Sequence, residues 1–152
     1  MGRSLRERRG KALGKRRKGR ELALAVLYQW DLLRKPWEKV FEETARDFSF
    51  PSEAKKFARE LVEGVVLNTP LLDSLIERFI KNWSLDRLSV VDRNILRLAI
   101  YEMLHHEETP PLVALDEAVE LSKKFSEGEK SGSFVNAILD KIYRENFHGK
   151  GD

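Results

Sequence analysis

Apolar residues in this 152-residue chain recur at intervals of three and four from about position 20 to the C-terminal region. That interval matches the turn of an α-helix and places the apolar side chains on one face. No segment shows the alternation of apolar and polar residues that is typical of a strand, and no repeat of about 20 to 50 residues is evident. The sequence therefore predicts an all-α fold.

Prolines and capping residues divide this pattern into about seven helices. Pro36 ends the first helix, and Thr69 followed by Pro70 has the form of an N-cap with proline at the first helical position. Ser89 and Ser133 are the expected N-caps of two later helices. The predicted helices cover approximately residues 16–35, 37–48, 52–68, 70–83, 90–104, 113–125 and 134–142. The helix after Ser89 is strongly apolar and is expected to be the central one.

The helices are expected to form one compact bundle. With 41% hydrophobic residues, the chain has the length and apolar content of one ordinary domain. We expect a single helical domain over residues 15–148, built from two small subdomains at about 15–83 and 84–148. Residues 1–14 carry too little apolar surface to offset the cost of ordering, so a flexible basic arm is expected there.

Several functional classes are excluded by what the sequence lacks. It has no cysteine, which excludes disulfides and thiol catalysis. His105 and His106 are adjacent and point about 100 degrees apart on a helix, so they cannot chelate one metal ion together. Neither a phosphate-binding glycine loop nor an apolar run of about 18 residues is present. We expect no enzyme activity, cofactor, metal or membrane association, and a cytoplasmic location.

Charge is distributed very unevenly along the chain. Residues 1–20 contain ten basic side chains and one acidic side chain, a net charge of +9, whereas the other 132 residues carry −6 of the total of +3. A basic arm before an acidic body is typical of a nucleic-acid-binding protein that also offers a surface to a basic partner. The alternative is a solubilising tail or one attracted to membranes.

Arginines at the start of the first helix are the clearest candidate binding residues. Arg16 and Arg20 share a helical face, and Arg17 lies close to it. Guanidinium groups there can bind phosphates through paired hydrogen bonds or stack on unpaired bases. Ion pairs with nearby acids such as Glu21 are the alternative. Tyr28 lies off the apolar stripe of this helix and is expected to reach the surface.

Five segments of the chain form a characteristic series of motifs. They read RRKGRELALAVLYQWD (16–31), LVEGVVLNTPLLD (61–73), LSVVDRNILRLAIYEM (88–103), VALDEAVELSKKF (113–125) and SFVNAILDKI (133–142). Together and in this order, from about residue 15 to 143, they resemble the successive motifs of the NusB (N-utilisation substance B) family of bacterial antitermination factors, and no single segment would suffice. The chain departs from the family in its longer basic extension and in Ala137, where glycine is frequent.

The resemblance implies an all-helical protein of two subdomains that binds boxA-type single-stranded RNA. It implies NusE, a ribosomal protein of the small subunit, as the direct partner, and RNA polymerase with NusA and NusG as the larger assembly. Matching the family's motifs residue by residue implies an RNA site made of Arg16, Arg17, Lys18, Arg20, Phe134 and Asn136. The same matching implies a NusE-facing set made of Tyr28, Phe79, Asp86 and Asp92.

Two other functions remain open from the sequence. Helical domains of this kind also occur at the front of ribosomal RNA cytosine methyltransferases, although this chain shows no Rossmann-like half and no cysteine nucleophile. A helix-turn-helix around residues 84–89 would indicate a duplex DNA binder, but both flanking helices are dominated by apolar residues.

The RNA site implied by the resemblance also predicts how binding depends on salt. If the four cations Arg16, Arg17, Lys18 and Arg20 contact RNA, the logarithm of the binding constant should fall against the logarithm of the salt concentration with a slope of about −3.

Overall fold

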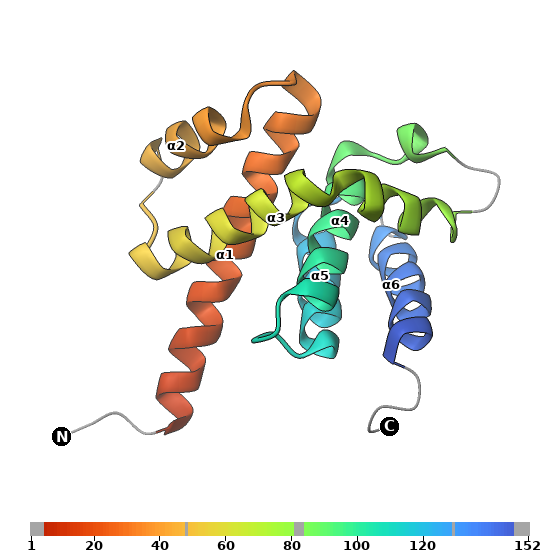
Figure 1. The fold of residues 1–152 in the computed structure, drawn as a ribbon. Coiled ribbons are helices and arrows are strands. Elements are labelled where there is room, and N and C mark those ends of the chain that lie inside the picture. Colours follow the sequence, from red (N-terminus) through yellow and green to blue (C-terminus); the bar gives the residue numbers. More distant parts are fainter. Residues whose placement is uncertain (1–4, 48, 81–83, 129, 148–152) are drawn as a thin grey trace. The chain divides into compact units, whose positions relative to one another are not determined.

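The computed structural model describes residues 5–47, 49–80, 84–128 and 130–147 (Figure 1). In these ranges every regular element is helical, which confirms the predicted all-α fold. The described part of the chain contains six α-helices, where about seven were expected, and one short 3-10 helix. The elements are α1 (Leu5–Leu33), α2 (Trp37–Asp47), α3 (Ser52–Glu77), η1 (Leu85–Arg87), α4 (Val90–His105), α5 (Pro111–Phe125) and α6 (Ser131–Phe147).

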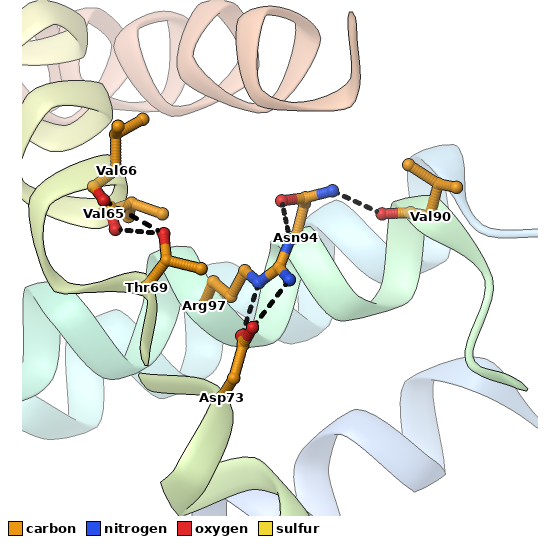
Figure 2. Close-up of polar contacts among 7 residues, drawn as sticks. All are labelled: Val65, Val66, Thr69, Asp73, Val90, Asn94 and Arg97. Atoms are coloured by element: carbon orange, nitrogen blue, oxygen red, sulfur yellow. Dashed lines mark hydrogen bonds and ion pairs between the residues drawn. The ribbon is translucent and has the colours of Figure 1, made fainter. Parts of the chain in front are cut away.

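The expected break at Thr69 is wrong, because α3 continues through Pro70 as one helix. Proline has no N–H, so Pro70 cannot donate the usual hydrogen bond to the carbonyl four residues earlier, which belongs to Val66. The Thr69 hydroxyl donates to that carbonyl at 3.2 Å and to the Val65 carbonyl at 2.7 Å (Figure 2). Buried Leu72 keeps the helical spacing of the core beyond the proline. Threonine therefore supports the helix here instead of capping a new one.

The chain divides into two compact units, Met1–Glu63 and Gly64–Asp152. We call them the N-terminal and C-terminal units. The division lies inside α3 and not near residue 84, where the sequence placed the boundary between subdomains. The Ser84–Leu88 break expected from the sequence holds the 3-10 helix η1, and the predicted end of the preceding helix at Trp83 lies outside the described residues.

In the N-terminal unit, α1 begins at Leu5, well before its expected start near residue 16. Eight of the eleven residues in segment 5–15 are arginine, lysine, leucine or alanine, which favour helix. Residues 1–4 lie outside the described part of the chain, and the mobility of the basic arm without a ligand stays a prediction. Further along α1, Ala23, Val26 and Leu27 are fully buried as expected, whereas Leu33 is exposed.

In the C-terminal unit, α4 is the central helix that the sequence predicts. It packs against α5 and α6, which also pack against each other. All residues from Asn94 to Ile100 are buried. Ser89 caps α4 as expected, since its Oγ accepts a hydrogen bond from the Asp92 amide at 3.0 Å. The expected cap at Ser133 is wrong, because α6 begins two residues earlier at Ser131.

Candidate nucleic-acid interface

Residues 16–20 of α1 are called the basic segment here. This segment presents three of its four predicted RNA-binding side chains to solvent. Arg17 and Lys18 are exposed, and Arg16 is partly exposed. Arg20 differs from the expectation of a surface arginine, because only 2% of it is exposed. Arg20 lies three residues before Ala23 and seven before Leu27, both fully buried, so it shares their helical face. That spacing is the signal in the sequence for the burial of Arg20, which lies closer to these core residues than Arg16 does.

A buried aromatic ring from α3 lies beside these arginines. The guanidinium carbons of Arg16 and Arg20 lie 5.0 and 5.3 Å from the centroid of the Phe57 ring. Both distances are within the range of a cation–π interaction. Phe57 is 7% exposed, and the apolar spacing of α3 places it on the face that packs into the core. The sequence gives no local signal for this contact, because 37 or more residues separate the partners.

Gly19 and an ion pair bring α1 and α3 together at this point. A Cβ at residue 19 would lie 2.9 Å from both the Ala54 carbonyl oxygen and Cδ2 of Phe57, so only glycine fits without a shift. Lys15 Nζ donates to Glu53 Oε2 at 3.0 Å, and both side chains remain open to solvent. The basic segment is therefore attached to the core of the N-terminal unit.

A surface hollow of about 480 Å³ lies in the C-terminal unit between the end of α5 and the start of α6. Asn136, a predicted RNA-binding residue, is exposed and lines it together with Lys123. The other lining residues are Val119, Ser122, Gly128, Gly132 and Ser133. Phe134, the other predicted RNA-binding residue of α6, is partly buried and is not among them. The hollow thus offers an ammonium group, an amide and hydroxyls to a polar ligand.

The four residues predicted to face a protein partner have different surroundings. Tyr28 is 38% exposed on α1 in the N-terminal unit, as expected. The other three belong to the C-terminal unit, where Asp86 is exposed on η1. Phe79 is partly buried, and its ring centroid lies 5.5 Å from the guanidinium carbon of Arg78.

Asp92 has internal partners that the sequence did not reveal. Its Oδ1 accepts a hydrogen bond from Ser126 Oγ at 2.5 Å, and its Oδ2 accepts one from Ser131 Oγ at 3.4 Å. Asp92 therefore ties the start of α4 to residues at the end of α5 and the start of α6. These partners are more than thirty positions away in the sequence, so no local pattern could identify them.

The two adjacent histidines make separate contacts. The His105 ring lies edge-on to Tyr101, with 5.4 Å between ring centroids, and His106 Nδ1 lies 3.0 Å from Thr109 Oγ1. Among the described residues, no three histidine or acidic side chains are grouped to hold a metal ion. No helix in the described ranges is long and apolar enough to span a membrane.

Comparisons with known proteins identify relatives along most of the chain. The model of the NusB family matches residues 17–144. The transcription antitermination protein NusB of Myxococcus xanthus is 45% identical over 138 residues, covering 86% of this chain and 95% of the relative. The solved structure of T. maritima NusB is 42% identical with a TM-score of 0.80, covering 86% of this chain and 91% of that one. A chain in a crystal structure of NusB and NusE with double-stranded RNA is 34% identical with a TM-score of 0.79. The match covers 86% of this chain and 97% of that one.

Proposed function

This chain belongs to the NusB family, and on that premise we propose that it is a transcription antitermination factor that binds boxA-type single-stranded RNA together with NusE. The observation that carries the proposal is the basic segment of α1, where exposed Arg17 and Lys18 and partly exposed Arg16 adjoin one another. Dense cationic segments of this kind bind nucleic acid mainly through phosphates. A solved relative is a complex of NusB and NusE with double-stranded RNA, which supports binding to NusE and to RNA.

We propose that Phe134 and Asn136 belong to a second part of the RNA path. The support for Asn136 is the hollow beside α6, where the Lys123 ammonium group can neutralise a phosphate and the Asn136 amide can form hydrogen bonds with a base or sugar. Phe134 does not line the hollow and is included because it lies two residues before Asn136 on α6. If this is so, Lys123→Ala should weaken RNA binding and make the salt slope shallower by about 0.7. Lys141→Ala serves as the control, because Lys141 is also an exposed lysine of this unit but does not line the hollow.

We propose that NusE binds the acidic body of the chain, with Tyr28, Phe79, Asp86 and Asp92 as candidate contacts. The net charge of −6 outside residues 1–20 supports a basic partner. The larger assembly would contain elongating RNA polymerase with NusA and NusG, in the cytoplasm where transcription takes place. We propose that the function is then to carry RNA polymerase past terminators, and the relatives' name, transcription antitermination protein, supports this.

Calorimetry with purified NusE and a boxA RNA tests the proposed function. We expect this chain to bind NusE, and the pair to bind boxA RNA more tightly than either protein alone. Double-stranded RNA and duplex DNA of the same sequence serve as competitors, because the relative's crystal contains double-stranded RNA. If duplex DNA competes as well as boxA RNA, or if neither NusE nor RNA binds, the proposal is wrong.

A further inference from the structure

We propose that Phe57 is a positioning residue of the RNA-binding surface, where its ring holds Arg16 and Arg20 in the arrangement that binds RNA. The inference rests on the function proposed above, since it assigns a role within the same RNA site. Phe57 belongs to α3 and not to the basic segment, and it is 7% exposed. The core therefore fixes the ring before any ligand arrives.

The geometry allows the ring to hold the arginines without blocking them. The two guanidinium carbons lie 5.0 and 5.3 Å from the same ring centroid. A guanidinium that lies over an aromatic face keeps its N–H groups at the edges of its plane, where they can donate to phosphate oxygens. Holding a long side chain in place before binding also reduces the entropy that is lost on binding.

The burial of the two arginines indicates different roles. Arg16 is partly exposed and can reach RNA, whereas Arg20 is 2% exposed and cannot reach it in this arrangement. We therefore assign Arg16 as the contacting residue of this pair, and Arg20 as a second positioning residue that shares the ring.

Gly19 makes this arrangement possible. It lies between the two arginines in sequence, and a Cβ at this position would lie 2.9 Å from Phe57 Cδ2 and from the Ala54 carbonyl oxygen. Glycine thus lets the backbone of α1 approach α3 closely enough for one ring to reach both guanidinium groups. The Lys15–Glu53 ion pair of 3.0 Å links the same two helices one turn earlier on α1.

The test compares phenylalanine variants of the full chain, bound to NusE, with fluorescein-labelled boxA RNA as the probe. Phe57→Leu should weaken RNA binding about fivefold to tenfold, because it keeps an apolar side chain but removes the aromatic face. Phe57→Tyr keeps the face and should bind within twofold of the parent. Phe41→Leu is the matched control, because Phe41 is 6% exposed and its ring lies 5.6 Å from Arg59, outside the basic segment. Phe41→Leu should also bind boxA RNA within twofold of the parent.

A double-mutant cycle separates positioning from a general loss of structure. Arg16→Lys keeps the charge but loses the planar group, so it should weaken binding in the parent and have little further effect when combined with Phe57→Leu. Arg16→Lys changes a partly exposed side chain, so parent-like binding by this variant would overturn the positioning role even if Phe57→Leu fails to fold.

Any of three results would overturn the positioning role. They are parent-like RNA binding by a folded Phe57→Leu, parent-like RNA binding by Arg16→Lys, and independent effects of the two changes in the cycle. If the parent complex itself does not bind boxA RNA, the proposed function fails, and this inference fails with it.

Discussion

Arg97 binds both carboxylate oxygens of Asp73, with Nε donating to Oδ1 at 2.7 Å and Nη2 donating to Oδ2 at 2.9 Å (Figure 2). The Arg97 side chain is 6% exposed and that of Asp73 is 21% exposed. Arg97 Nη1 also donates to Asn94 Oδ1 at 3.1 Å, and Asn94 Nδ2 donates to the Val90 carbonyl at 2.8 Å. This network joins the second half of α3 to α4 within the C-terminal unit.

We predict that Asp73→Ala lowers the free energy of unfolding by about 3 kcal/mol, because it leaves the Arg97 charge buried without its carboxylate. Urea unfolding followed by circular dichroism measures this change. Glu145→Ala is the control, because it breaks the Arg78–Glu145 ion pair of 2.6 Å, whose side chains are 56% and 42% exposed. That exposed pair should contribute less than about 1 kcal/mol. If Asp73→Ala and Glu145→Ala lower the free energy of unfolding equally, the prediction is wrong.

A second prediction concerns two glycines inside helices. A Cβ at Gly64 would overlap the ring of Tyr101, so Gly64→Ala should destabilise the chain by roughly 1–3 kcal/mol despite the better helix propensity of alanine. A Cβ at Gly14 would have no atom within 4 Å, so Gly14→Ala should stabilise α1 by about 0.5–1 kcal/mol. Thermal unfolding of both variants checks the opposite signs. If both substitutions stabilise the chain, α3 and α4 are not in close contact at Gly64.

The sequence predicted well those features that depend on neighbours along one helix. The apolar spacing identified the all-α fold and the central helix, and Ser89 was identified as a cap because its bond to the Asp92 amide is local. Pro70 was misinterpreted, because a threonine before a proline can cap a new helix or, through its hydroxyl, maintain an existing one. Both outcomes place Leu72 in the core, so the local sequence does not distinguish them.

Contacts between distant segments explain what the sequence could not predict. Arg20 was expected with the exposed cations, although its spacing from Ala23 and Leu27 places it on the buried face. The aromatic partner of Arg20 is Phe57, which comes from another helix. Asp92 was expected at a partner surface, yet its carboxylate accepts hydrogen bonds from Ser126 and Ser131.

A third prediction separates the two acidic residues proposed to face NusE. Asp86 is exposed, so Asp86→Lys should slow association with NusE and leave the melting temperature nearly unchanged. Asp92→Lys should also lower stability, by about 1 kcal/mol or more, because it removes the acceptor for Ser126 and Ser131. Stopped-flow association at low and moderate salt, with a melting curve for each variant, distinguishes the two effects. If Asp86→Lys associates as fast as the parent at low salt, Asp86 lies outside the interface.

The fourth prediction concerns how RNA binding depends on salt. With Arg20 buried, three cations of the basic segment remain to neutralise phosphates: Arg16, Arg17 and Lys18. At about −0.7 per contact on single strands, the basic segment should contribute a slope of about −2 instead of the −3 expected for four contacts. Replacing Arg17 and Lys18 with alanine should make the slope shallower by about 1.4 and leave the melting temperature unchanged, because both side chains are exposed.

Arg20→Ala should have the opposite pair of effects, because Arg20 is buried. It should lower the melting temperature and leave the salt slope of RNA binding close to that of the parent. A parent-like melting temperature for Arg20→Ala, together with a slope shallower by about 0.7, would show that Arg20 leaves the core to bind RNA.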